Sequence, residues 1–315
     1  MRRHRRLARA VAAALMLGGL SACTPQPIVA LPTASQSASV RTIVVGTPGV
    51  PDDANANEGA LVANLYAAAL NAAGLTAVVK PEDPKDPTLL DQLESGTIDV
   101  LPGYGATLLQ KLEPGADTPD AATVLSSLQG QLPREVTMLD PTKAEDNDSV
   151  VVTAVTAQKY QLKTLADLGQ VCRKLSMGGS AQFRTADHGI PGLDADYGCV
   201  PASYKELPNN NNQLLMALLR NEVQIADIHS SSPDIQDNAL VTLTDTKGLF
   251  IHNPLVALAN SKTVPVDYQA VINKVSAQLN NEELQNLNRL GEGASPSQLQ
   301  SVAKAWLVQN GLVKQ

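Results

Sequence analysis

Histidine and serine are the first side chains to consider as nucleophiles, general bases or metal ligands. After the first 22 residues only His188, His229 and His252 remain, and no two of them have the short spacing of a zinc site. The stretch GGSAQ at 178–182, which would make Ser180 a nucleophile, resembles a nucleophile elbow but lacks its closing glycine. The sequence contains no HExxH, no paired CxxC, no phosphate-binding glycine loop and no GxGxxG after a strand. The pattern therefore points to no catalytic residue, no metal site and no cofactor.

The first of the three cysteines indicates a lipid attachment site. Cys23 follows Leu-Ser-Ala, and this tetrapeptide resembles the bacterial lipobox, in which the cysteine is diacylated and becomes the first mature residue. Five arginines and an apolar run from Val11 to Leu20 precede it, which is typical of a signal peptide over residues 1–22. The alternative is a short membrane anchor with an incidental cysteine, but the run falls short of the roughly 20 residues that span a bilayer. We therefore expect export, with a lipid on Cys23 holding the protein to the outer face of the cytoplasmic membrane.

The other two cysteines, Cys172 and Cys199, form an even pair in a chain that we expect to be exported. Such a pair favours a disulfide, and closing a loop of this size stabilises a fold by roughly 3 kcal/mol in the chain-entropy model. The alternative is two buried free thiols.

Composition and charge exclude one class of partner. The chain has 315 residues with 24 Lys+Arg and 31 Asp+Glu, so its net charge is −7, and removal of residues 1–22 with their five arginines leaves −12. This acidity argues against nucleic-acid binding. The length favours two lobes over a single core. Residues 23–40 are rich in Pro, Ser, Thr and Ala and are expected to form a flexible tether reaching roughly 20 to 25 Å.

Apolar β-branched runs alternate with Ala/Leu-rich helical patterns along the rest of the chain, which indicates an α/β protein. The C-terminal pattern predicts a helix with Ser295 as N-cap, Pro296 in its first turn, Trp306 in its buried stripe and Gly311 at its end. A loop is expected through 103–105. The other expected helices are 58–73 and 89–94, and the expected strands are 41–46, 76–79, 97–101 and 150–155.

An internal repeat relates two distant segments. Residues 94–104 read as a helix end, a tight turn, a strand and a loop, and residues 214–230 repeat this unit. Alignment of Gly96 with Asn221 pairs the following positions: Ile98 with Val223, Val100 with Ile225 and Tyr104 with His229. Tyr104 and His229 would then each follow a central strand, and open α/β sheets bind ligands at the carboxyl ends of such strands.

The sequence combines the turn GIPGL at 189–193 and Tyr197-Gly198 with Lys247-Gly248 and Phe250. In this combination it resembles the substrate-binding lipoproteins of ABC importers for osmoprotectants such as glycine betaine, choline and proline betaine. The resemblance extends from about Thr42 to the C-terminus in these blocks: 45–74, 93–109, 160–168, 178–198, and 217–235 with 242–250.

This resemblance implies a periplasmic-binding-protein-like fold of type II. Two α/β lobes would be joined by two crossing strands and would close on a ligand between them, with lobe 1 formed by 41–148 and 243–315 and lobe 2 by 149–242. It also implies a monomer that binds a small solute, works with a permease and an ATPase, and carries out no chemistry of its own.

The family binds its quaternary ammonium ligand in a cage of four tyrosines, by cation–π attraction. In this sequence only the first cage position holds a tyrosine, Tyr104, while the other three positions hold Ser149, His229 and Asn253. Thr107 matches a polar neighbour in the first loop. The family's arginine for a ligand carboxylate falls on Ala186, with Arg184 as a substitute two residues earlier.

Loss of three aromatic walls at roughly 1 kcal/mol each would weaken binding about a hundredfold. We therefore expect weak or no binding of glycine betaine, and a polar, hydroxylated ligand that hydrogen-bonds to Ser149, His229 and Asn253. Two alternatives use the same scaffold. One is an extracytoplasmic enzyme with Ser180 or His229 as a catalytic residue, and the other is a sensor or assembly lipoprotein.

Overall fold

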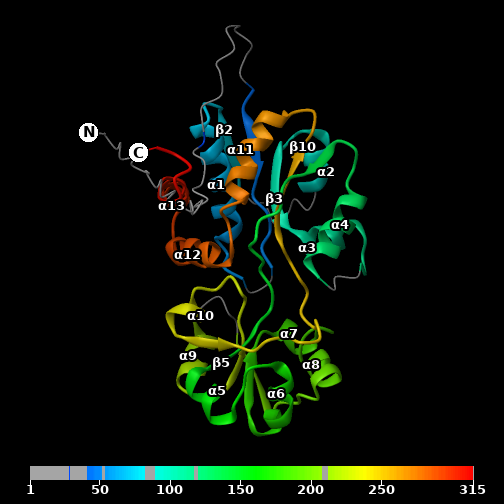
Figure 1. The fold of residues 1–315 in the computed structure, drawn as a ribbon, viewed down its shortest axis with the longest axis vertical. Helices are drawn as coiled ribbons and strands as arrows, with labels where there is room; N and C mark the ends of the chain where they lie inside the picture. The colour runs from blue at the N-terminus through cyan, green and yellow to red at the C-terminus, as the bar shows by residue number, and fades with distance from the viewer. Residues whose placement is uncertain are drawn as a thin grey trace, which may run out of the picture.

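Two five-stranded sheets organise the protein, one in each of two lobes (Figure 1). The computed structural model describes residues 28, 41–51, 54–81, 89–116, 120–207 and 212–314. The predicted signal peptide at 1–22, the predicted lipid attachment site Cys23 and the predicted tether except for Ile28 therefore lie outside the described residues. Within the described part of the chain, no helix has both the length and the apolar character that a membrane crossing requires.

The sheet of lobe 1 has the strand order β2-β1-β3-β10-β4. β1 is parallel to β2 and β3, whereas β10 is antiparallel to both of its neighbours. Alternate residues of β10 pack into the cores on opposite faces of the sheet, so the strand is buried on both sides. In the order of the sheet, the strands are Ala77–Lys80, Ile43–Gly46, Val100–Tyr104, Leu255–Asn260 and Val136–Met138.

Helices cover both faces of this sheet (Figure 1). One face packs against α1 (Glu58–Ala72), α11 (Val266–Ser276), α12 (Asn281–Gly291) and α13 (Pro296–Gln309). The other face packs against a smaller group, which consists of α2 (Leu89–Ser95), α3 (Gly105–Leu112) and α4 (Ala121–Gln131).

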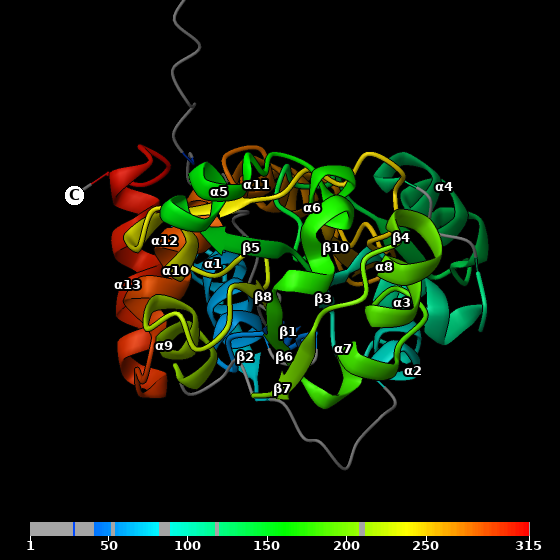
Figure 2. The ribbon, with the colours of Figure 1, turned by 90° about the horizontal axis from the view of Figure 1, so that it is seen from below.

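The sheet of lobe 2 repeats this plan with the order β7-β6-β8-β5-β9, and Figure 2 shows the molecule from the side of this lobe. β6 is parallel to β7 and β8, and β5 is antiparallel to β8 and β9. In sheet order the strands are Ser203–Glu206, Ser176–Gly179, Ile225–Asp227, Val150–Thr153 and Leu240–Thr242. The surrounding helices are α5 (Ala154–Tyr160), α6 (Leu165–Val171), the 3₁₀ turn Cys172–Lys174, α7 (Ala181–Thr185), α8 (Ile190–Tyr197), α9 (Gln213–Leu219) and α10 (Asp234–Asp237).

The internal repeat is confirmed. β3 and β8 occupy the same third position of their sheets, and the turns before them have positive φ, +75° at Gly96 and +58° at Asn221. The two N–H groups after Gly96 both donate to the carbonyl of Gln92, at 2.8 and 3.1 Å, and the two after Asn221 donate to that of Ala217, at 2.8 and 3.3 Å. The two lobes are therefore built around the same turn.

The third strand of lobe 1 begins later than the sequence pattern predicts. β3 starts at Val100 instead of residue 97, because the buried Asp99 carboxylate accepts the Val44 N–H at 2.8 Å and Arg41 at 2.8 Å. The expected loop through 103–105 is also wrong. Pairing of Tyr104 with Leu255 extends the strand to Tyr104, and α3 follows at once.

Other local predictions are confirmed. α13 begins with Pro296 after a capping box between Ser295 and Gln298, and Trp306 on its inner face is only 3% exposed. The predicted Val-rich strand ends at Thr153, earlier than expected, because the Thr153 hydroxyl accepts the Thr156 N–H at 3.2 Å and starts α5.

Two crossing segments, 139–149 and 243–254, join the lobes and run side by side between them (Figure 1). The Asp146 N–H donates to the Asn253 carbonyl at 3.2 Å, and the Asn253 N–H donates to Asn147 Oδ1 at 2.8 Å. The expected two-lobed α/β architecture of type II is confirmed, while the residue boundaries of the lobes remain a prediction.

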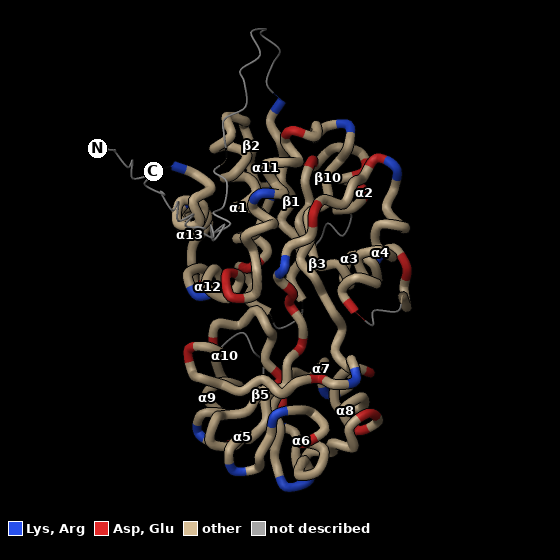
Figure 3. Tube along the Cα trace, viewed as in Figure 1, with Lys and Arg blue, Asp and Glu red and all other residues tan. Residues whose placement is uncertain are grey.

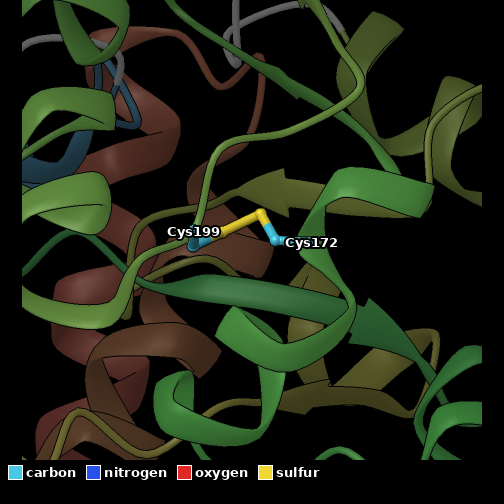
Figure 4. The surroundings of a disulfide bond; sticks show 2 residues. All are labelled: Cys172 and Cys199. Atoms are coloured by element: carbon cyan, nitrogen blue, oxygen red, sulfur yellow. A yellow bond between two sulfur atoms is a disulfide. The ribbon is translucent and has the colours of Figure 1, made fainter.

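A disulfide joins Cys172 to Cys199 in lobe 2, as predicted (Figure 4). It connects the 3₁₀ turn after α6 to the residue that follows the glycine ending α8. Both cysteines are fully buried in the core of the lobe.

We expect the double variant Cys172→Ala/Cys199→Ala to lose about 3 to 4 kcal/mol of unfolding free energy, because the bond closes a loop over a sequence separation of 27. Urea unfolding of both proteins without reductant measures this difference. With reductant the two curves should converge. A difference below about 1 kcal/mol without reductant would show that the bond contributes little.

Candidate functional site

A cavity of about 290 Å³ lies between the two lobes, and we call it the interlobe cavity. Lobe 1 contributes the loop after β1 and the first turns of α3. Lobe 2 contributes the start of α7 and the segment after β8, and both crossing segments complete the lining. The site thus lies where the carboxyl ends of β1, β3, β6 and β8 meet, which is the expected place for a ligand in open α/β sheets.

Three of the predicted site residues, Thr107, His229 and Asn253, line this cavity. Asn253 fixes the start of α3 to the second crossing segment. Its Oδ1 accepts the N–H groups of Ala106 and Thr107 at 3.0 and 3.3 Å, and its Nδ2 donates to Thr107 Oγ1 at 3.2 Å. The structure brings these residues together although they are far apart in the sequence.

The other three predicted site residues, Tyr104, Ser149 and Arg184, do not line the interlobe cavity. Tyr104 is 1% exposed, and its hydroxyl donates to the Glu58 carboxyl group. Ser149 is buried at the end of the first crossing segment. Arg184 pairs with Glu206 at 2.5 Å on the surface of lobe 2. A ligand-binding role for these three residues stays a prediction.

Three aspartates in the cavity lining were missed by the sequence analysis: Asp146, Asp148 and Asp227. Asp146 Oδ1 lies 3.2 Å from His229 Nδ1, and Asp148 Oδ1 lies 3.7 Å from His229 Nε2. The run EDND at 145–148 directly before a buried strand was the available signal. By itself this acidic run is typical of a solvent-exposed loop, because the distant residues that bury it are not apparent in the local sequence.

The surrounding carboxylates control the charge of His229. Burial alone lowers the pKa of this side chain, but the charge of Asp146, its hydrogen bond to His229 and the charges of Asp148 and Asp227 outweigh it. The pKa of His229 is therefore raised well above its usual value, which favours the protonated form of the ring. The sequence does not indicate this raised pKa, because it shows only a single histidine at the end of a strand.

Glu58 is a second buried ionisable group, in the first turn of α1. Its carboxyl group accepts hydrogen bonds from the Tyr104 hydroxyl and from Asn288 Nδ2. Burial and then the nearby charge of Asp146 raise the pKa of Glu58 to about 8, although hydrogen bonds from Asn288 and Ser231 oppose the shift. The sequence alone suggests an exposed charge at a helix N-terminus, so Glu58 was also missed.

Helix α12 of lobe 1 holds the segment of lobe 2 that follows His229. Gln285 Nε2 donates to the Ser230 carbonyl at 2.8 Å, and Asn288 Nδ2 donates to the Ser231 carbonyl at 2.9 Å. Arg289 Nε pairs with Asp237 Oδ2 at 2.9 Å. These contacts fix the backbone on which His229 stands.

Two further observations concern metal ligands and Ser180. Among the described residues no group of three His, Cys, Asp or Glu side chains could hold a metal ion. The Ser180 hydroxyl, which is a nucleophile only in the enzyme alternative, accepts the Phe183 N–H at 3.0 Å and acts as the N-cap of α7.

Comparison with known proteins identifies close architectural relatives. Residues 42–309 match the family model described as the substrate binding domain of ABC-type glycine betaine transport systems. A glycine betaine/carnitine/choline ABC transporter structure has a TM-score of 0.73 with 19% identity, covering 85% of this chain and 98% of that one. Apo YehZ from Escherichia coli has a TM-score of 0.71 with 21% identity, covering 86% and 99%. The lactococcal OpuAC complex with glycine betaine gives a TM-score of 0.53 with 12% identity, covering 85% and 96%.

We expect Glu58→Gln to reduce the dependence of stability on pH. Because the folded pKa of Glu58 is raised to about 8, its contribution to stability is fully present below pH 4.5 and is lost as the pH rises to 8. The unfolding free energy of the wild type should therefore fall, relative to that of the variant, by a few kcal/mol between these limits. Urea unfolding at several pH values measures this difference.

Glu282→Gln provides the matched control, because Glu282 also lies in the first turn of a helix but is exposed. This control should follow the wild type at every pH. Parallel curves for wild type and Glu58→Gln would mean that Glu58 is ionised in the folded protein at neutral pH.

Proposed function

Because the chain belongs to the family of substrate-binding domains of ABC-type glycine betaine transport systems, we propose that it captures a small polar solute and delivers it to an ABC import permease. The observation that carries this proposal is the interlobe cavity, to which both lobes and both crossing segments contribute polar side chains. A site built in this way can be assembled and dismantled by movement of one lobe against the other.

Capture would follow from closure of lobe 2, residues 149–242, onto lobe 1, residues 41–148 and 243–315. The two crossing segments are the natural hinge, because they are the covalent links between the lobes. Contacts that only the closed form makes would then supply the binding free energy. The protein would act as a monomer, together with the permease and ATPase subunits of its importer.

The ligand specificity would differ from that of a tyrosine cage. The resemblance places His229 and Asn253 at two cage positions. Both residues line the cavity and offer hydrogen bonds instead of the face of a tyrosine ring. The remaining ring, Tyr104, is almost completely covered and uses its hydroxyl for Glu58. A solute that hydrogen-bonds to the cavity walls is therefore favoured over a trimethylammonium group.

We propose that the protein works outside the cytoplasm as a lipoprotein. The basic start, the apolar run and the Leu-Ser-Ala-Cys tetrapeptide ending at Cys23 support this proposal. A lipid on Cys23 would keep the solute-binding lobes close to the permease.

Isothermal calorimetry should find no micromolar binding of glycine betaine. Without three aromatic walls the affinity should be about a hundredfold weaker than that of a complete cage, because roughly 1 kcal/mol is lost per wall. A thermal-shift screen of betaines, amines, amino acids and sugars then identifies a solute that does stabilise the protein. A micromolar dissociation constant for glycine betaine would contradict the predicted change in specificity.

Substitution Cys23→Ser should abolish lipid attachment. Labelling of cells with a fatty-acid analogue and fractionation of membranes would then show an unlabelled protein with an uncleaved or unanchored N-terminus. Cys172→Ser is the control, because the disulfide cysteines of lobe 2 should have no effect on labelling. Persistent labelling of Cys23→Ser would exclude this lipidation site.

A further inference from the structure

Carboxylates dominate the charge of the interlobe cavity. Asp146, Asp148 and Asp227 line it, and the other charged or titratable groups of the lining are His188 and His229. Three carboxylates against two imidazoles leave a negative charge even when both rings carry a proton. No lysine or arginine belongs to this lining among the described residues. Acidic residues also lie along the segments between the lobes in Figure 3.

Asp146 retains an unused acceptor at this site. It is 1% exposed and lines the cavity. Its Oδ1 is engaged by His229 Nδ1 at 3.2 Å and by the Ser231 N–H at 3.3 Å, whereas its Oδ2 is buried without a hydrogen-bond partner among the described residues. A buried acceptor without a donor costs free energy, which a donor on a bound solute would recover.

The lining of the interlobe cavity favours a solute with N–H donors over a fully methylated ammonium ion. Phe183 is the one aromatic residue in the described lining. A quaternary ammonium has no N–H group, so it depends on ring faces and apolar surface around its methyl groups. A protonated primary or secondary amine instead forms charge-assisted hydrogen bonds with carboxylates, which are about twice as strong as neutral ones.

We propose that the interlobe cavity binds a small solute with a protonated primary or secondary amine, whose N–H groups donate to Asp146, Asp148 and Asp227. The inference rests on the proposed solute-binding function and names the ligand class. A carboxylate on the solute disfavours binding, because the lining is already negative and Arg184 is paired with Glu206 outside it. The preferred solute is therefore an amine or an amino alcohol rather than an amino acid.

A methylation series tests this inference. Ethanolamine, N,N-dimethylethanolamine and choline share a carbon skeleton and a hydroxyl group, while their ammonium groups offer three, one and no N–H donors. Calorimetry on the purified protein should give an affinity that falls at each step, by at least tenfold from ethanolamine to choline. In a parallel series, glycine should bind more weakly than ethanolamine. Choline binding as tightly as ethanolamine, or no binding of ethanolamine at 10 mM, would overturn the inference.

Variants of the cavity aspartates test which carboxylates bind the amine. Asp227→Asn and Asp148→Asn should each weaken ethanolamine binding at least tenfold and choline binding by a clearly smaller factor, because choline loses only charge attraction whereas ethanolamine also loses an N–H acceptor. Two variants are used because Asp227 is buried and one substitution could impair folding, whereas the Asp148 side chain is 20% exposed.

Asp187→Asn is the control, because Asp187 is exposed and does not line the cavity. Circular dichroism and melting temperature without solute check the fold of each variant. Ethanolamine affinities of well-folded Asp148→Asn and Asp227→Asn that equal the wild-type value would overturn the inference.

The same experiments separate this inference from the proposed function. If a neutral or quaternary solute binds and His229→Ala weakens its binding, the solute-binding function is supported and the amine preference is wrong. If no solute of the broad thermal-shift screen binds, both proposals fail.

Discussion

The buried ion pair between Asp146 and His229 sets the positions of the segments that meet between the lobes. Charged groups taken out of water are costly unless they are paired and hydrogen-bonded. Asp146 lies on a crossing segment and His229 follows the central strand of lobe 2, so their pairing fixes the position of this segment against that lobe. Glu58 of lobe 1 lies close enough for the Asp146 charge to raise its pKa. The protonation of Glu58 is thus linked to the position of the crossing segment that carries Asp146.

Amide side chains hold the segments around the charged centre, which consists of Asp146, His229 and Glu58. Asn253 joins the second crossing segment to the first turn of α3, and Gln285 and Asn288 of α12 hold the backbone beside His229. Amides can donate and accept without carrying a charge, so they position ionised groups without adding to the electrostatic cost of burial. Opening of the lobes would expose the centre to water and weaken the forces that shift its pKa values, because charges interact less strongly in a high dielectric.

Tyr104 does not line the interlobe cavity. Its hydroxyl is committed to Glu58 and its ring to the core of lobe 1. The cavity lining combines carboxylates, amides and imidazoles with a few apolar side chains such as Phe183. Recognition at such walls depends on hydrogen-bond donors and charge, whereas recognition in a cage depends on the faces of rings.

The amino-acid sequence by itself determined the features that depend on near neighbours or on a shared pattern. The start of α13 at Ser295 and Pro296, the matching turns at Gly96 and Asn221 and the family follow from residues within a few positions or from the order of motifs. These could be predicted because capping, turn conformation and periodicity are local properties. The disulfide follows from the even cysteine pair in a chain that we expect to be exported.

Only the tertiary structure decided which charges are buried and which side chains share a cavity. Glu58, Asp146 and Asp227 read as ordinary surface acids in the sequence, yet the fold buries them around His229. The late start of β3 likewise depends on the contact of Asp99 with Val44, 55 residues away. Burial is a property of packing between distant segments, and the cost of burying a charge depends on partners that the local sequence does not contain.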